Sequence, residues 1–279
     1  GKSLEKIEQE LIICRKCPRL VAWREEVACV KRKAYRDQDY WGKPVPGFGD
    51  PDARILVLGL APGAHGSNRT GRMFTGDGSG NFLYPALFRA GFASQPEAST
   101  RTDGLVLRDV FISAVCRCAP PANKPTREEI LNCLPWLEQE MQALKNLQGV
   151  VVLGKIALDG LLSLPAFADL PKKQFPFGHD RFYETFPRLP WILCSYHPSL
   201  QNTQTGRLTT DMFDQIWQTA KRTLEIVSFD RVLNLLMNNR WCDGGLEGRL
   251  GPRMMMFAVL PSLPYAYSVL TYACNCFDF

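Results

Sequence analysis

Two polar loops, each directly after an apolar run, carry the side chains best suited to chemistry. The first, residues 59–80, follows the apolar run 54–59 and is rich in Gly, Ser, Thr, Asn and Arg. The second begins at His197, directly after the apolar run 190–196. Glycine lets a backbone approach a ligand closely, and small polar side chains supply hydrogen-bond donors and acceptors. Because open α/β sheets bind ligands at the carboxyl ends of their strands, both loops are candidate binding loops.

Four cysteines in two pairs form a second candidate site: Cys14, Cys17, Cys118 and Cys133. Four thiolates from two distant parts of a chain can bind an iron–sulfur cluster or, alternatively, a zinc ion. Cys118 is preferred over Cys116 because Pro120 and Pro121 turn the chain out of the preceding strand. A redox pair at the CxxC and four unrelated thiols are the other interpretations.

The elements that must position these loops alternate along the chain. Short runs rich in Val, Ile and Leu predict strands at 54–59, 109–115, 149–153 and 190–196. Between and around them, apolar periodicity predicts helices at 4–14, 81–90, 126–144, 155–164 and 209–226. Thr126 followed by Glu129 is typical of a helix-starting capping box. Continuous apolar strands alternating with helices indicate a doubly wound α/β domain whose sheet is covered on both faces.

Bulk composition sets limits on the class of protein. The chain has 279 residues, a net charge of +5 and 22% charged residues, which permits a polyanionic partner without requiring one. Its first residues are charged and contain no apolar secretory core, so we expect a cytoplasmic protein whose ten cysteines are metal ligands or buried thiols. From about residue 227 the composition changes, and prolines interrupt the apolar run after Met254. We therefore expect one domain at 1–226, an extension of unknown role at 227–279, and no membrane-spanning segment.

Three segments and the four cysteines together resemble one known family. Residues 59–80, 118–125 and 197–209 are similar to the uracil-DNA glycosylase superfamily, and most closely to its family 5, the bacterial and archaeal UDGb group. The resemblance covers residues 1–226. It implies a three-layer α/β sandwich with a four-stranded, mainly parallel sheet flanked by helices. It also implies a 4Fe-4S cluster held by the four cysteines, in an N-terminal arm that belongs to the domain.

The resemblance further implies a monofunctional DNA glycosylase. Such an enzyme flips uracil or another deaminated base out of DNA and removes it by hydrolysis, which leaves an abasic site; hypoxanthine and xanthine are further candidate bases. Ala61 and Ala114 stand where related families carry Asp or Asn. This departure leaves the identity of the water-activating group open.

Roles in that reaction follow from residue chemistry. Phe74 is expected to stack on the flipped base, Asn123 to bind the base edge, and backbone amides near Gly63 to assist. His197 can donate a hydrogen bond to the base oxygen on which negative charge develops, and Asp77 can position water or stabilise the electron-poor sugar. The alternative roles are core packing for Phe74, a turn for Asn123 and a helix N-cap for Asp77.

The expected partner is DNA that contains deaminated bases, bound by a monomer. The candidate phosphate contacts are Arg69, Arg72 and Arg207, any of which could instead be an ordinary surface residue. Leu200 and Gln201 are candidates for a wedge inserted into the base stack. A damage-binding module without catalysis and an iron–sulfur redox protein are the alternative functions. A nucleotide-binding enzyme is disfavoured because no GxxxxGK[ST] motif follows the first strand.

Overall fold

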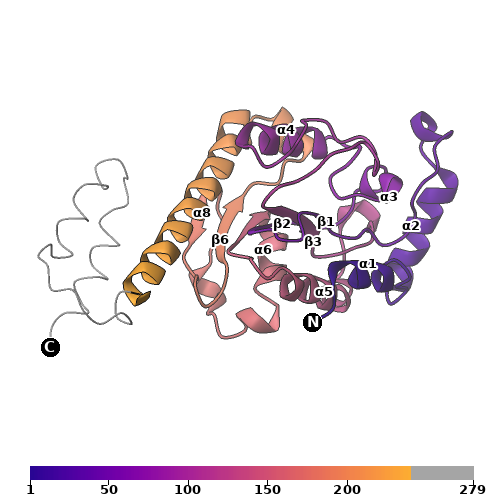
Figure 1. Ribbon diagram of the computed structural model, residues 1–279. Helices are drawn as coiled ribbons and strands as arrows, with labels where there is room; N and C mark the ends of the chain where they lie inside the picture. The colour runs from indigo at the N-terminus through magenta and orange to yellow at the C-terminus, as the bar shows by residue number, and fades with distance from the viewer. Residues whose placement is uncertain (240–279) are drawn as a thin grey trace, which may run out of the picture. The chain divides into compact units, whose positions relative to one another are not determined.

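The computed structural model contains a six-stranded sheet in the order β1–β3–β2–β4–β6–β5 (Figure 1). Its four middle strands are mutually parallel. They are β3 (Val110–Ala114), β2 (Ile55–Gly59), β4 (Gly149–Leu153) and β6 (Trp191–Ser195). Every residue of these strands is buried, as expected for parallel strands covered on both faces. The predicted α/β sandwich and its four core strands are confirmed.

Two short antiparallel strands at the sheet edges were not predicted. β1 (Phe48–Gly49) pairs with β3, and β5 (Arg181–Tyr183) pairs with β6. They are two and three residues long and lie in stretches of the sequence rich in Pro and Gly. Too short to show an apolar period, they are defined by pairing with their neighbours rather than by a pattern of their own.

Helices cover both faces of the sheet, and the alternation of side chains along each strand divides the core in two. Ile55 and Val57 face one core, with α4 (Gly80–Ala90) and α8 (Thr210–Asn239). Leu56 and Leu58 face the other, with α5 (Arg127–Ala143) and α6 (Lys155–Leu161). This arrangement gives three layers, with the sheet in the middle (Figure 1). The Thr126–Glu129 capping box is present at the start of α5, as predicted.

The N-terminal arm contains one more helix than the sequence predicted. The predicted helix 4–14 ends earlier, as α1 (Leu4–Leu11), and a second helix, α2 (Pro18–Val30), follows it. Proline suits the first position of α2 because a first-turn N–H has no helical partner. Cys14 and Cys17 therefore lie in the turn between the two helices. The remaining short elements are η1 (Lys33–Tyr35), α3 (Ser67–Thr70), η2 (Pro121–Asn123), η3 (Pro165–Phe167), η4 (Lys172–Gln174) and α7 (Leu200–Gln204).

The structure describes residues 1–239, with side chains through residue 228. Residues 1–228 form one compact unit. The predicted extension 227–279 lies mostly outside the described residues, so the predicted domain boundary stays a prediction. Within the described part of the chain, no helix is both long and apolar enough to cross a membrane.

Candidate functional site

The two candidate loops meet at the carboxyl edge of the sheet. The ring centroids of Phe74, in the loop after β2, and His197, directly beyond β6, lie 5.9 Å apart with an angle of 31° between the ring planes. A second contact joins the same loops, since a Cβ on Gly78 would lie 2.5 Å from Cδ2 of Leu200. Because β2 and β6 are parallel and both adjoin β4, their following loops leave the sheet on the same side.

Phe74 is held against the end of β2. A Cβ on Gly59 would lie 2.8 Å from Cζ of Phe74, so the ring packs where only glycine leaves room. The backbone of Phe74 has a φ of 52°, a left-handed conformation uncommon for a large side chain. The side chain is 8% exposed and belongs to the core beneath α4. One ring thus packs in the core and also contacts the imidazole of His197.

His197 is partly buried, and this burial lowers its pKa to about 4. The imidazole is therefore neutral near pH 7, with one ring nitrogen carrying a proton and the other accepting. Its backbone carbonyl accepts a hydrogen bond of 2.8 Å from Nδ2 of Asn202, which fixes the turn into α7. Within residues 1–228 no hydrogen bond to either ring nitrogen is found.

Asp77 caps the helix that follows it and also faces the first loop. Its Oδ1 accepts hydrogen bonds from the backbone N–H groups of Ser79 (3.0 Å) and Gly80 (3.1 Å), where α4 begins. Its Oδ2 faces the loop backbone, because a Cβ on Gly63 or Gly66 would lie 3.0 or 2.0 Å from that atom. Burial raises the pKa of Asp77, although both N–H groups and the charge of Arg69 oppose the shift. The capping role is present, and one carboxylate oxygen is left for a second role.

Two of the three predicted phosphate contacts have other partners. Arg72 is 3% exposed, and its guanidinium binds both carboxylate oxygens of Asp103 at 2.8 and 2.6 Å. Arg69 donates to the backbone carbonyls of His65 and Gly76 and to the side chain of Gln38. Both cations are already used to hold the first loop in shape, so this structure assigns them a structural role.

The other predicted DNA contacts are exposed. Arg207 lies over the ring of Tyr196 at 4.6 Å and has no ion-pair partner among residues 1–228. Leu200 is 54% exposed at the start of α7, with Gln201 exposed beside it. Asn123 is exposed in η2 with a φ of 57°, and no contact in the described part of the chain joins it to Phe74 or His197. Its turn role is therefore present, whereas its predicted role at the base edge stays a prediction.

Two aromatic contacts near these loops were not predicted. His179 stacks on Tyr196 with centroids 5.0 Å apart, and its Nδ1 accepts the backbone N–H of Tyr196 at 3.2 Å. His65 forms a 3.0 Å hydrogen bond between its Nδ1 and the hydroxyl of Tyr40. Only three histidines occur in the chain, which is the one sequence signal that could have drawn attention to His179.

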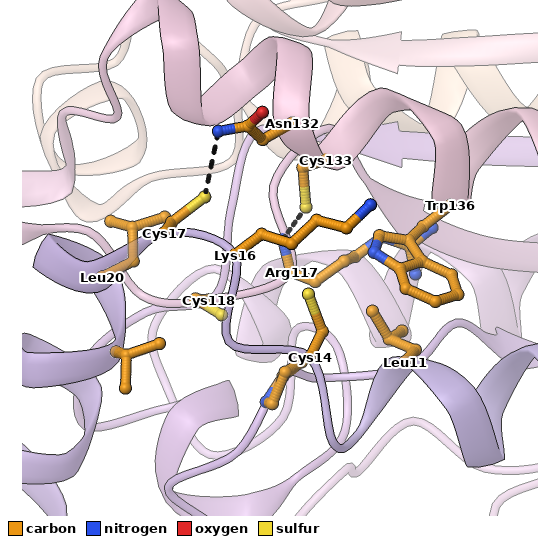
Figure 2. Close-up of a pocket in the computed structure, with 12 residues that line it drawn as sticks. Leu11, Cys14, Lys16, Cys17, Leu20, Arg117, Cys118, Asn132, Cys133 and Trp136 are labelled. Atoms are coloured by element: carbon orange, nitrogen blue, oxygen red, sulfur yellow. Dashed lines mark hydrogen bonds between the residues drawn. The ribbon is translucent and has the colours of Figure 1, made fainter.

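The four predicted cysteines line a single pocket between the N-terminal arm and α5. Figure 2 shows their sulfur atoms facing one another around a shared space; the cysteines are Cys14, Cys17, Cys118 and Cys133. Cys116 does not line this pocket. Arg19 of α2 closes the arm onto α5, with two hydrogen bonds of 2.7 Å to the carboxylate of Glu129. Two distant parts of the chain are thus joined around the cysteines.

Nitrogen donors face three of the four sulfur atoms. Nη1 of Arg24 lies 2.9 Å from the sulfur of Cys118, and the backbone N–H of Arg117 donates to Cys133 at 3.2 Å. Nδ2 of Asn132 lies 3.8 Å from the sulfur of Cys17 (Figure 2). Such donors suit sulfur atoms that carry negative charge, as metal-bound thiolates do.

Arg24 is unusual because it is a buried cation without a buried carboxylate. Its side chain is 2% exposed, its Nε has no hydrogen-bond partner, and the nearest carboxylate, that of exposed Glu25, lies 3.8 Å away. Burial raises the pKa of Cys118 to about 12, although the charge of Arg24 opposes that shift. A negatively charged group at the sulfur atoms would balance the Arg24 cation, so the donor set fits a metal centre bound by thiolates.

Comparison with known proteins identifies the class and then the group. The sequence model of the Uracil DNA glycosylase superfamily matches residues 46–221, which include the whole sheet and both loops. A Type-5 uracil-DNA glycosylase from Thermus thermophilus is 56% identical over 218 residues, 78% of this chain and 97% of the relative. Those from Mycobacterium leprae (47% over 221 residues, 79% and 95%) and Pyrobaculum aerophilum (42% over 210 residues, 75% and 88%) are also similar. The chain belongs to the uracil-DNA glycosylase superfamily and, within it, to the type-5 group.

The buried ion pair between Arg72 and Asp103 generates a stability prediction. Arg72→Met leaves Asp103 unpaired and should lower the free energy of unfolding by about 3 kcal/mol or more, measured by urea titration. Lys155→Met is the control, because its ion pair with Asp159 is more than half exposed and should contribute at most about 1 kcal/mol. Equal losses in the two variants would contradict the structural role of Arg72.

The same pair sets a pH dependence. Burial alone would raise the pKa of Asp103, but the hydrogen bonds from Arg72 and three backbone N–H groups outweigh it and hold the pKa well below its usual range. The stabilisation is therefore complete above the unfolded-state pKa of about 3.9 and is lost as pH falls through the lowered folded-state pKa. The stabilities of wild type and Arg72→Met should accordingly converge in strong acid.

Proposed function

We propose that this protein is a monofunctional DNA glycosylase that removes uracil, and other deaminated bases such as hypoxanthine or xanthine, from DNA. The observation that carries the proposal is the pairing of Phe74 with a neutral His197 at the edge where two loops meet. A damaged base is unreachable inside the stack, so it must enter this edge as a flipped nucleotide. Such a base needs an aromatic ring to stack on its face and an N–H to donate to its oxygen, and Phe74 and His197 are suited to these two contacts.

The ring geometry favours a particular placement of the base. A base sandwiched between two rings needs a spacing of about 6.8 Å, twice the 3.4 Å repeat of stacked bases. The observed centroid distance is 5.9 Å, so the base stacks on the exposed part of Phe74 and presents its edge to His197. In the proposed arrangement the imidazole lies beside the base oxygen rather than over the base ring.

The proposed reaction is hydrolysis of the bond between base and deoxyribose. That bond breaks with its electron pair leaving on the base, and His197 donates a hydrogen bond to the base oxygen that becomes negative. The sugar carbon becomes electron-poor, and the Asp77 carboxylate stabilises it and orients the water that adds there. The proton of this water passes to Asp77 and then to solvent. The free Oδ2, directed at Gly63 and Gly66, is the oxygen that would act.

DNA contacts are proposed at the exposed side chains around this edge. Arg207, stacked on Tyr196, has a free guanidinium suited to a phosphate. Leu200 packs on Gly78 from the other loop, so an exposed apolar side chain stands at the junction where a base would leave the stack. Gln201, beside it, completes the proposed wedge, and a monomer contains all of these groups.

We further propose that Cys14, Cys17, Cys118 and Cys133 hold a 4Fe-4S cluster. The four sulfur atoms line one pocket, and nitrogen donors face three of them, which suits thiolates bound to a metal centre. The preference for a cluster over a single zinc ion comes from the resemblance of the four-cysteine pattern to that of the family. When bound, the cluster supplies a cross-link between the arm and the loop after β3, since hydrolysis needs no electron.

A panel of oligonucleotides tests the proposed activity. Each carries one modified base, namely uracil, hypoxanthine or xanthine, and abasic sites are detected after incubation without an electron donor. The wild-type protein should release free uracil and leave an alkali-sensitive site. Tight binding to uracil DNA with an intact strand would favour the damage-binding module instead, and activity only with a reductant would favour a redox protein.

His197 generates the sharpest prediction about the reaction. His197→Ala should slow single-turnover uracil release by about 10²–10³-fold, because one donor to the developing oxyanion is lost. Its affinity for uracil DNA should change little. His65→Ala is the control, since that ring binds Tyr40 and has no assigned role in the reaction. Equal rates for wild type and His197→Ala would remove the proposed role.

The pH dependence of uracil release by the wild-type protein tests whether His197 acts as a neutral imidazole. A histidine with an ordinary pKa of about 6.5 would produce an inflection between about pH 6 and 8. His197, with its pKa lowered to about 4, stays neutral through that range, so it should produce none there. An inflection near pH 6.5 that disappears in His197→Ala would contradict the neutral imidazole.

Arg24 and Cys133 test the proposed cluster. The purified wild type should be brown, and Cys133→Ser should be colourless. Arg24→Gln removes the buried cation beside Cys118 and should weaken iron binding by about 10–100-fold, followed as loss of visible absorption in the presence of a chelator. Arg19→Gln is the control, because it weakens the contact between the arm and α5 without touching a sulfur atom. A colourless wild type with one zinc per chain would overturn the cluster.

A further inference from the structure

A group of basic side chains outside the site described above has no internal partner. Arg32, Lys33 and Arg36, which we call the basic turn, follow α2 and are all exposed. Within residues 1–228 their side chains make no ion pair and no hydrogen bond. The neighbouring Lys31 differs, because it lies 3.9 Å from Asp39.

This lack of partners distinguishes the basic turn from the arginines nearby. Arg69 and Arg72 are held by acceptors of the first loop or by Asp103, and Arg101 is paired with Glu8. The arginines that hold the first loop in shape thus have acceptors within the protein, whereas the three cations of the basic turn are exposed to solvent. Unpaired surface cations have no stabilising role that would account for holding them together in one ordered turn.

The basic turn is fastened to the first candidate loop. The guanidinium of Arg69 lies 4.0 Å from the ring centroid of Tyr35 and donates to Gln38 at 2.6 Å. The Tyr40 hydroxyl bonds to His65 of that loop, and it also accepts the backbone N–H of Arg32 at 3.3 Å. Figure 1 shows the segment that follows α2 on the side of the molecule where α3 lies. The basic turn is therefore held against the loop that also contains Phe74.

The charge of the basic turn reaches the loop. Burial lowers the pKa of His65, and the charges of Arg32 and Arg69 lower it further. Residues 31–40 contain four basic and two acidic side chains, and Lys31 faces one of the acidic ones. The three unpaired cations and Asp37 therefore leave the segment a net charge of +2.

We propose that the basic turn binds the phosphate backbone of duplex DNA on one side of the flipped nucleotide. This inference rests on the proposed function and adds to it a second contact region, apart from Arg207 and α7. Lysine and arginine contacts to phosphate fix the register of a protein on DNA and release counterions. Flanking contacts of this kind hold the strand while a base is withdrawn from the stack, and they carry no base specificity.

The test compares salt dependence of binding in two triple variants. One replaces Arg32, Lys33 and Arg36 with Gln. The control variant replaces Lys145, Lys173 and Arg188 with Gln. These three side chains are also exposed and have no ion pair among the described residues. Lys145 and Arg188 precede β4 and β6, at the opposite edge of the sheet. The ligand is an undamaged duplex, so the outcome does not depend on whether uracil is released.

The logarithm of the DNA-binding constant falls linearly with the logarithm of the salt concentration, and each phosphate contact adds about 0.9 to the steepness of that line. Loss of three phosphate contacts should therefore make the line shallower by about 2.7. The control should keep the wild-type slope. Single-turnover uracil release at saturating enzyme should be unchanged in the basic-turn variant, because no reacting group is touched. Equal slopes in both variants, or a loss confined to single-stranded DNA, would overturn the inference. Absence of uracil release from the wild type would instead count against the proposed function alone.

Discussion

Parallel pairing of β2 and β6 on either side of β4 is the constraint on which the candidate site depends. A parallel sheet places the carboxyl ends of its strands at one edge, so loops distant in sequence leave it side by side. Phe74 and His197 touch for this reason, and neither loop could build the site alone. The strands themselves are wholly buried and apolar, so the scaffold contributes rigidity and the loops contribute chemistry.

A second theme is the division of the basic residues between structure and surface. Arg117 is fully buried and donates to both carboxylate oxygens of Glu140, which also accepts from Ser113. Arg72 and Asp103 repeat this arrangement in the first loop. A buried guanidinium without an acceptor would be costly, so these cations are unavailable to DNA. The count of 33 Lys and Arg residues therefore overstates the number of cations available to a polyanion, and the unpaired exposed cations are the informative ones.

Sequence alone predicted what depends on local pattern. The four core strands and the Thr126 capping box follow from apolar runs and from residue spacing, and both are present. Contacts between residues far apart in the chain leave no such pattern in the sequence. β1 and β5 are defined by their neighbours, and the roles of Arg69 and Arg72 depend on acceptors such as Asp103 that only folding brings near. The four cysteines could be predicted as a set because their chemistry and paired spacing are themselves a signal, whereas Arg24, which donates to one of them, carried none.

The N-terminal arm with its cysteines and the first candidate loop form one connected structure rather than two separate sites. The side-chain Nδ2 of Asn68 in α3 donates to the backbone carbonyl of Arg24 at 3.2 Å, and the backbone carbonyl of Asn68 accepts the N–H of Gly42 at 3.0 Å. Arg24 in turn faces Cys118, so a short chain of contacts runs from the sulfur atoms to the helix inside the first loop. Whatever occupies the cysteine pocket thus fixes the arm, and the arm fixes α3. A centre held by the four cysteines would in this way also govern the shape of the first candidate loop.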